Sequence, residues 1–268
     1  MGIENKKDQI QKIIRASLNN FSTNFKTRHI SELNNPKGTI NMKIHNVFIS
    51  ALGEDIQYYT ALARSLDSSL GNALEKMAIE IAKLSYVVEQ RVIGPLYQNQ
   101  TIQIAELLEK YKRHEKVPQI ADYACLRKID KNSKSIKRRH ESDYYLIDKE
   151  LNNHYLIELK IGGDLDNKKA RSEKEAILEQ YAILSNTLPP TVNIQIYFAT
   201  AYNRFGENKE WKQERVKQFF STEELLIGKD FWNFVCKSNE GYSWVLEAYK
   251  EKSDELTDSL NEIKDKYL

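Results

Sequence analysis

The chain has 268 residues, which is long enough for one large domain or two small ones with a buried core. Its 40 basic and 38 acidic residues nearly balance, which excludes a histone-like protein and an acidic tail protein but not a local basic surface. Cys125 and Cys236 lie too far apart for a metal knuckle or a disulfide framework, and they indicate a reducing compartment.

Targeting and nucleotide-binding signals are missing from the sequence. No apolar run approaches the roughly 20 residues that span a bilayer, and the first residues lack the apolar core of a secretory signal. We therefore expect a cytoplasmic protein without membrane contact. Gly162-Gly163 is not followed by the Lys-Ser/Thr of a phosphate-binding loop, so dependence on ATP is not expected.

The first part of the chain, residues 1–118, is predicted to be mainly helical. Apolar residues at helical spacing predict four helices, over residues 8–18, 42–65, 68–84 and 101–113. Ser68 and Ser69 are good N-cap residues for the third helix, and Pro118 closes the region.

The middle part, residues 119–203, changes to an alternating pattern that is typical of strands. Residues 143–148 are aromatic and β-branched, and residues 154–161 alternate, so the two segments are predicted to form a β-hairpin. A helix over 166–184 and a strand over 192–199 are predicted to follow.

The last part, residues 204–268, is again predicted to be mainly helical. The order of the elements predicts a single α/β domain, in which a mixed β-sheet is flanked by helices and preceded by a helical N-terminal region.

The second strand of the hairpin contains the most informative residues. Alternation puts Leu156, Glu158 and Lys160 on one face of an otherwise apolar strand. Charged residues are rarely buried unless they are paired or bind a metal. If this face is solvated, however, Glu158 and Lys160 form only a weak surface pair, and the strand alone leaves both interpretations open.

Asp143 begins the first hairpin strand, and the fold of a hairpin brings it near Glu158. Two carboxylates beside a lysine suit a hard divalent cation, which prefers oxygen ligands. The lysine can orient or deprotonate a water molecule. This combination is typical of metal-assisted hydrolysis of phosphodiesters.

These residues match a known nuclease pattern. Asp143 followed by Glu158-Leu159-Lys160 resembles the PD-(D/E)XK motif, with Ser142 in place of the proline. In addition, residues 65–75, 140–148 and 158–170 resemble type II restriction endonucleases of the TdeIII family, over roughly residues 45–200.

The resemblance implies Mg²⁺-dependent, site-specific cleavage of double-stranded DNA by a homodimer, at a short interrupted palindrome such as GGNCC. It implies that Asp143, Glu158 and the carbonyl of Leu159 bind the metal and that Lys160 positions the attacking water. Glu75 would add an outer carboxylate to the site, unless it is only a solvated helix position.

A run of basic residues leads into Asp143. Residues 127–139 contain seven basic side chains and one acid, and the run ends in Lys137, Arg138 and Arg139. Charge runs are often only solvated, but this position favours an electrostatic track for the phosphate backbone of DNA.

Further candidate DNA contacts lie beyond the hairpin. Lys168, Lys169 and Arg171 are predicted in the first turns of the next helix, where a phosphate or a guanine edge would meet them. Arg204 follows the strand that ends near Ala199, within a group that includes Asn203, Asn208 and Lys209.

Two rival functions stay open at this point. One is a repair or junction-resolving nuclease built on the same core. The other is a non-catalytic DNA-binding or scaffold protein, in which Glu158 and Lys160 are a surface pair.

Overall fold

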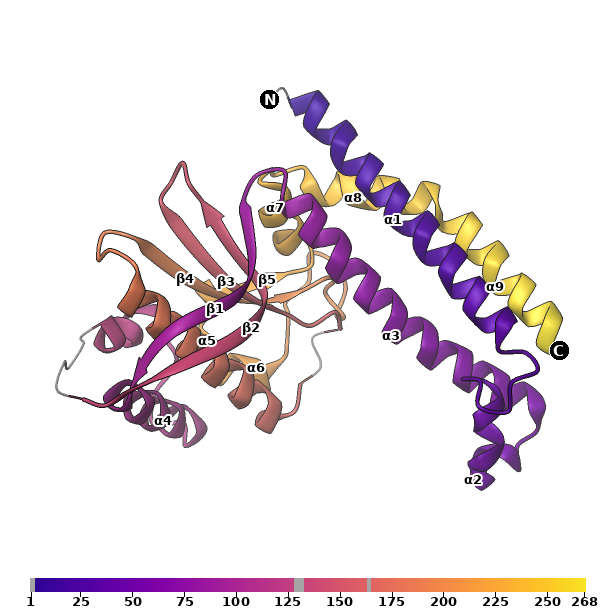
Figure 1. Ribbon diagram of the computed structural model, residues 1–268, viewed down its shortest axis with the longest axis horizontal. Helices are drawn as coiled ribbons and strands as arrows, with labels where there is room; N and C mark the ends of the chain where they lie inside the picture. The colour runs from indigo at the N-terminus through magenta and orange to yellow at the C-terminus, as the bar shows by residue number, and fades with distance from the viewer. Residues whose placement is uncertain (1–2, 128–132, 163–164) are drawn as a thin grey trace. The chain divides into compact units, whose positions relative to one another are not determined.

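The structure is a computed structural model that describes residues 3–127, 133–162 and 165–268. It divides into two compact units, Met1–Ile81 with Glu240–Leu268, and Ala82–Asn239. The first unit is helical and the second contains the sheet (Figure 1). The organisation as one functional domain stays a prediction.

The sheet of the second unit is mixed, as the sequence predicts. Strands β1, β2 and β3 pair antiparallel, and β3, β4 and β5 pair parallel. In sheet order the strands are β1 (Val87–Tyr97), β2 (Ser135–Asp148), β3 (Asn153–Leu159), β4 (Asn193–Thr200) and β5 (Leu225–Ile227).

Helices of the same unit cover both faces of the sheet. They are α4 (Gln98–Lys112), η2 (Ile120–Arg127), α5 (Asn167–Thr187), α6 (Glu214–Lys217), η3 (Thr222–Glu224) and α7 (Lys229–Cys236). Helix α5 packs across β1 to β4, and Leu156 of β3 is buried in that core. On the opposite face, Tyr155 packs edge-on against Phe234 of α7, with ring centroids 4.9 Å apart. The predicted mixed sheet with flanking helices is therefore confirmed.

Strand β1 was not expected from the sequence. The pair Gly94-Pro95 is typical of a turn and does not predict a strand. However, β1 is an edge strand, where proline is tolerated because the backbone on the outer side forms no hydrogen bonds to another strand. Gly94 also lets α5 approach closely, since a Cβ there would lie only 2.7 Å from Cγ2 of Ile183.

Strand β2 begins at Ser135, eight residues before the predicted start. Lys137, Arg138 and Arg139 pair with Pro95, Gly94 and Ile93 of β1, so the described end of the basic run is part of the sheet. Backbone pairing does not depend on side-chain polarity, which is why a charged segment can extend a strand. The three-residue strand β5 was not expected either, because it lies in the predicted helical region.

The helical unit contains α1 (Ile3–Ser31), η1 (Asn41–His45), α2 (Val47–Ser50), α3 (Glu54–Ala82), α8 (Gly241–Glu251) and α9 (Ser253–Tyr267). Helix α1 lies along α8 and α9 (Figure 1), and ion pairs such as Arg15 with Glu251 at 2.8 Å follow this contact. Phe21, Phe25 and Tyr58 are buried in the core between the helices.

The predicted break between helices at Ser68-Ser69 is wrong. Helix α3 continues through both serines, because the apolar stripe Leu62, Leu66 and Leu70 runs on without a proline or glycine to stop it at those positions. The break lies earlier, at Gly53, whose φ of +99° separates α2 from α3. None of the described helices is both long enough and apolar enough to cross a membrane.

Candidate active site

The hairpin of β2 and β3 brings the two predicted carboxylates together. Tyr144 pairs with Ile157, so Asp143 and Glu158 come next on the same face of the two strands. The carboxylate of Asp143 accepts a hydrogen bond from the backbone N–H of Leu159, with Oδ2 and N 3.0 Å apart. The carboxylate is thus fixed against the main chain of the Glu158-Leu159-Lys160 segment.

This face of β3 is enclosed by α5 and is not a solvated surface. Leu156 is fully buried, and the side chain of Glu158 is 14% exposed. The amine of Lys160 donates to Oε1 of Glu158, and its backbone N–H donates to the carbonyl of Ala199 at 2.9 Å. The interpretation of Glu158 and Lys160 as a weak surface pair is therefore wrong.

The electrostatics of the site follow from this burial. Burial and the neighbouring negative charge of Asp143 raise the pKa of Glu158 to about 8, against the opposing effect of Lys160. Burial disfavours the charge on Lys160, but Glu158, Glu173 and Asp143 outweigh it and hold its pKa above the usual range. The site therefore contains a firmly protonated amine and more carboxylates than that amine can neutralise.

Glu173 is a site residue that the sequence did not reveal. It lies on α5, and its Oε1 is 3.1 Å from the amine of Lys160, so Lys160 lies between two carboxylates. Glu175 and Glu179 are on the same helix, and sequence spacing alone does not distinguish Glu173 from them. Only the packing of α5 on the sheet selects it.

The donor set fits a hard divalent cation that keeps some of its own water. Within the described ranges, no three acidic, histidine or cysteine side chains are grouped so as to hold a metal by themselves. Mg²⁺ is commonly bound by only one or two carboxylates, with water and substrate phosphate completing its octahedron. Asp143 and Glu158 provide such a pair, and burial together with the nearby charge of Asp143 raises the pKa of Glu158, so that a bound cation would favour its ionised form.

The predicted basic track is described only in part. Lys128 and Lys131 lie outside the described residues. Lys137, Arg138 and Arg139 are exposed on β2, and the guanidinium of Arg139 pairs with Glu141, with Nη2 and Oε1 2.7 Å apart. Exposed cations thus precede Asp143 along β2, on both faces of the strand.

Helix α5 begins beside the site with three predicted DNA contacts. Lys168 and Lys169 are exposed, and Asp166 caps the helix by accepting from the N–H of Lys169 at 2.8 Å. Arg171 is half-buried, and its Nη2 lies 3.9 Å from Oε2 of Glu109 on α4.

The loop after β4 contains the last group of predicted contacts. Arg204 is exposed there. The side chain of Asn203 is used within the loop, because its Nδ2 donates to the carbonyl of Lys209 at 2.7 Å and its Oδ1 accepts from the N–H of Phe205. Asn203 therefore shapes the loop, and of these two residues Arg204 is the better candidate for contact with DNA.

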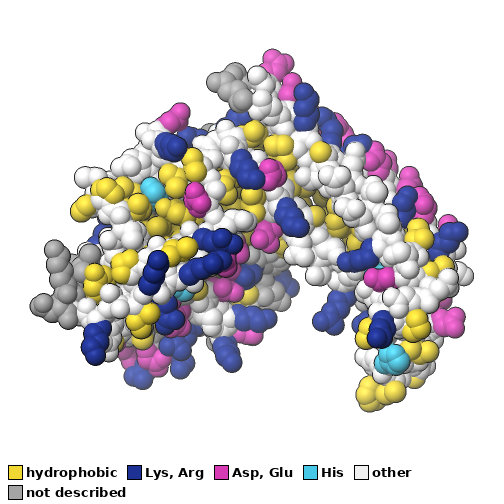
Figure 2. Space-filling view, in the orientation of Figure 1, with side chains coloured by type: hydrophobic (Ala, Val, Ile, Leu, Met, Phe, Trp, Pro, Cys, Tyr) yellow, Lys and Arg dark blue, Asp and Glu magenta, His cyan; other side chains and the backbone are white. Residues whose placement is uncertain are grey.

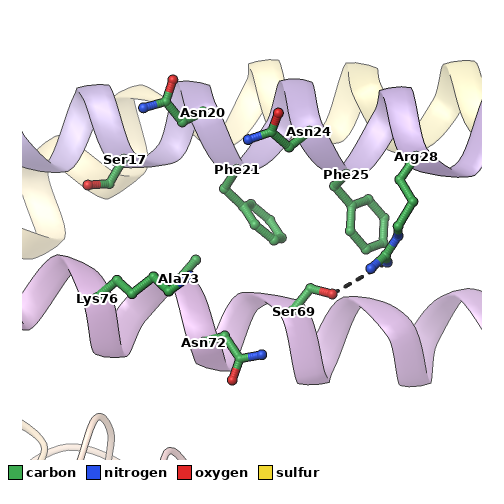
Figure 3. Close-up of a pocket in the computed structure, with 10 residues that line it drawn as sticks. All are labelled: Ser17, Asn20, Phe21, Asn24, Phe25, Arg28, Ser69, Asn72, Ala73 and Lys76. Atoms are coloured by element: carbon green, nitrogen blue, oxygen red, sulfur yellow. Dashed lines mark hydrogen bonds between the residues drawn. The ribbon is translucent and has the colours of Figure 1, made fainter.

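Glu75 belongs to α3 of the helical unit, whereas Asp143, Glu158 and Lys160 belong to the sheet unit. Its role as an outer carboxylate stays a prediction. A separate hollow of about 390 Å³ lies between α1 and α3 (Figure 3), and it is lined by polar side chains, two phenylalanines and the cations Arg28 and Lys76. Neither Glu75 nor the residues of the sheet site line it.

Comparison with protein families places the chain in a family. The model described as "Type II restriction endonuclease, HinfI" matches residues 6–253. Comparison with curated proteins and with solved structures gives no match.

Proposed function

The chain belongs to the HinfI family of type II restriction endonucleases, and from that premise we propose that Asp143, Glu158 and Lys160 form its active site. The family makes the protein a DNA-hydrolysing enzyme and excludes the non-catalytic alternative. It confirms the expected class of enzyme, while the likeness to TdeIII enzymes and to the PD-(D/E)XK pattern remains a resemblance. One observation supports the site above all: the three charged side chains converge on an enclosed strand face where carboxylates outnumber amines.

Asp143, Glu158 and the carbonyl of Leu159 are proposed to bind Mg²⁺. When bound, Mg²⁺ supplies Lewis-acid stabilisation of the charge that builds up on the scissile phosphate and on the leaving 3′-oxygen. The chain contributes the rigid placement of its ligands. Asp143 is held by the N–H of Leu159, and Glu158 is held by Lys160.

Lys160 is proposed to position the attacking water and not to deprotonate it. Its pKa is held above the usual range by Glu158 and Glu173 despite burial, so the amine stays charged at neutral pH and can only donate hydrogen bonds. The water oxygen bonds to phosphorus in line with the 3′-oxygen, whose bond to phosphorus breaks. The attacking water loses one proton to solvent, and the leaving 3′-oxygen takes one up from solvent. The products carry a 5′-phosphate and a 3′-hydroxyl.

Glu173 is proposed as a positioning residue for Lys160. Two carboxylates on opposite elements, Glu158 on β3 and Glu173 on α5, restrict where the amine can lie. Glu75 is proposed as an outer carboxylate of the site.

Contacts with DNA are proposed for the exposed cations that approach the site. Lys137, Arg138 and Arg139 would neutralise backbone phosphates along β2, which gives affinity without sequence selection. Lys168, Lys169, Arg171 and Arg204 are proposed to contact phosphates or base edges nearer the site.

The enzyme is proposed to act in the cytoplasm as a homodimer on a palindrome. One chain has one such site, and a two-fold dimer supplies the second site for the other strand. The target is then a short palindrome with an unread central base. The resemblance to TdeIII enzymes implies GGNCC, which remains a prediction until cleavage products are sequenced.

Incubation of the protein with phage DNA, with and without Mg²⁺, followed by sequencing of the fragment ends, tests this function. We expect defined fragments with 5′-phosphate ends in Mg²⁺ and none after chelation. Cleavage that follows DNA structure, such as nicks or junctions, would favour the repair-nuclease alternative. Intact DNA in Mg²⁺ at every protein concentration would contradict the proposal.

A further inference from the structure

We infer that residues 42–59 of the helical unit, here named the 42–59 surface, form the contact between two copies of the chain. This inference deepens the proposed function, since it locates the homodimer contact that the proposal leaves unplaced. It rests on features of the helical unit that are independent of the active site.

The 42–59 surface is unusually apolar for an exposed segment. Its seven large exposed side chains are Met42, Ile44, Val47, Phe48, Leu52, Ile56 and Tyr59, each at least 40% exposed. Phe48 is 83% exposed. Hydrophobic side chains gather at the α2 end of the unit (Figure 2). Single exposed apolar residues are ordinary, but a contiguous group of this size indicates an interaction surface.

The exposure is not a consequence of a loose chain end. Asn46 caps α2, because its side-chain oxygen accepts from the N–H groups of Phe48 and Ile49, both at 3.2 Å. Asn41 donates to the carbonyls of Glu32, Leu33 and Asn35 and so ties η1 to the turn after α1. The apolar side chains are therefore held outward by an ordered backbone.

A hollow of about 530 Å³ adjoins this surface. Its lining includes Ile44 and Tyr58 from the segment and Leu268 from the C-terminal end of the chain. Ile44 belongs both to the hollow and to the exposed group, so a protruding side chain and a receptive hollow lie next to each other. Phe48 of one copy can enter the hollow of the second copy, and the reverse contact forms at the same time. A two-fold axis needs this kind of self-complementary surface.

The charges of the surface also complement a second copy. Lys43 and His45 lie near one end of the segment, and Glu54 and Asp55 lie near the other. Within the described part of the chain, none of the four forms an ion pair. When two copies pack with their segments antiparallel, Lys43 of each faces the acidic end of the other. The same two acids disfavour DNA as the occupant, because they would repel its phosphates.

The number of residues on the surface is that of a standard interface, which involves about 20–30 residues on each partner. The 18 residues of the 42–59 surface and the eight other residues that line the hollow make 26.

The test is the molar mass of the full chain and of F48D, measured by light scattering without DNA. We expect a mass near twice 31.3 kDa for the unchanged chain and near 31.3 kDa for F48D. The dissociation constant should rise about 100-fold or more, because a central apolar anchor is removed twice across a two-fold axis. L151D, at an exposed leucine of the sheet unit, should remain a dimer.

Charge reversal gives a second test that leaves the apolar side chains in place. K43E and E54K should each weaken the dimer, and the double variant K43E/E54K should restore it. Equal far-ultraviolet circular dichroism spectra for all variants would show that folding is unaffected, because the melting temperature itself depends on dimerisation. A monomeric unchanged chain, or F48D that remains a dimer at low micromolar concentration, overturns the inference.

Failure of this inference is distinguishable from failure of the proposed nuclease. A chain that F48D converts to a monomer supports the inference even if no DNA is cut. Conversely, Mg²⁺-dependent cleavage by a chain whose mass does not respond to F48D leaves the nuclease intact and removes the dimer surface. Loss of DNA binding in F48D without a change in mass would identify DNA as the occupant and also overturn the inference.

Discussion

Two neighbouring residues of α5, Glu173 and Lys174, belong to two different clusters of charged side chains. Glu173 lies against Lys160 in the proposed active site, whereas Lys174 points into a closed cluster with Tyr123 and Glu224. Each cluster combines a lysine amine with one or more acidic side chains, and α5 contributes Glu173 to one and Lys174 to the other. They differ in enclosure and in the balance of charge.

The cluster around Lys174 is balanced and sealed. The amine of Lys174, which is 0% exposed, lies 2.7 Å from Oε1 of Glu224, and Tyr123 donates to the same oxygen at 2.7 Å. The amine also lies 4.3 Å from the centre of the Phe220 ring. Burial lowers the pKa of Lys174 although Glu224 opposes this shift. One cation and one carboxylate satisfy each other, and no charge is left for a ligand.

The active-site cluster has an excess of acid. Glu158 and Glu173 contact one amine, the charge of Asp143 also acts on it, and the site is partly open, with Lys160 32% exposed. The comparison teaches that a buried lysine–glutamate pair alone does not identify a site. The excess of carboxylates and the opening to solvent distinguish a place for a cation from a structural pair.

The largest effect is expected from D143A, E158A and K160A, each of which should lower cleavage by about 10³-fold or more, because these residues act as one unit. The melting temperature without metal should change little in D143A and E158A, which relieve the mutual repulsion of the carboxylates, and should fall in K160A, which leaves the carboxylates without their amine. Cleavage of plasmid DNA and circular dichroism measure the two quantities. A variant that cuts at near the unchanged rate would remove that residue from the site.

K174M should show the opposite pattern. It leaves Glu224 buried without its cation, which should lower the free energy of unfolding by about 3–5 kcal/mol. Cleavage per folded molecule should be unchanged. Urea denaturation checks this value, and K174M/E224Q should recover part of the loss. A K174M protein with unaltered stability would contradict a structural role for the pair.

E173Q should lower cleavage by about 10–100-fold, an effect typical of groups that orient an active-site residue. The loss should fall mainly on kcat, because Lys160 acts on the attacking water and not on DNA affinity. E175Q, on the same helix, is the matched control and should cut normally. Equal cleavage rates for E173Q and E175Q would show that the contact of Glu173 with Lys160 does not contribute to cleavage.

Divalent-metal binding should depend on pH through Glu158. Its carboxyl holds a proton up to a pKa of about 8, and a metal must displace that proton. Affinity for Ca²⁺, which should bind without efficient cleavage, is expected to rise about tenfold per pH unit between pH 6 and 8 and then level off. Calorimetric titration measures this, and flat affinity over the range would contradict it.

The raised pKa of Glu158 also determines the direction in which the free energy of unfolding changes with pH. An acid whose folded pKa is raised from 4.5 to about 8 binds its proton more tightly in the folded state. Without metal, the free energy of unfolding should therefore fall as pH rises between these values, and Ca²⁺ should counteract the fall. E173Q removes a neighbouring negative charge and should move the midpoint to lower pH.

The smallest effect is expected at exposed cations that are in neither cluster. Neutralising Lys137, Arg138 and Arg139 together should lower the log–log salt slope of DNA binding by about 0.9 for each phosphate that the variant no longer neutralises. The contribution of Arg139 should be the weakest, because it already pairs with Glu141. Discrimination between cognate and mismatched DNA should persist. If filter binding shows an unchanged salt dependence, the basic run is only a solvated part of the strand and does not contact DNA phosphates.

Alternation and turn residues predicted the part of the fold that holds the site. The hairpin, the helix after it and the strand over 192–199 are present, and Leu156, Glu158 and Lys160 do lie on the same side. These features depend on neighbours in sequence, where the period of two is fixed by backbone geometry. The charged start of β2 and the edge strand β1 escaped prediction, because partners distant in sequence stabilise them.

The sequence by itself determined that Asp143, Glu158 and Lys160 belong together, since one hairpin suffices to align them. Only the tertiary structure decided that this face is enclosed, that Glu173 joins it, and that Lys174, one residue later, does not. The physical reason is that burial and charge balance depend on how α5 packs on the sheet. Successive residues of a helix point about 100° apart, so packing assigns them to different environments that sequence spacing cannot distinguish.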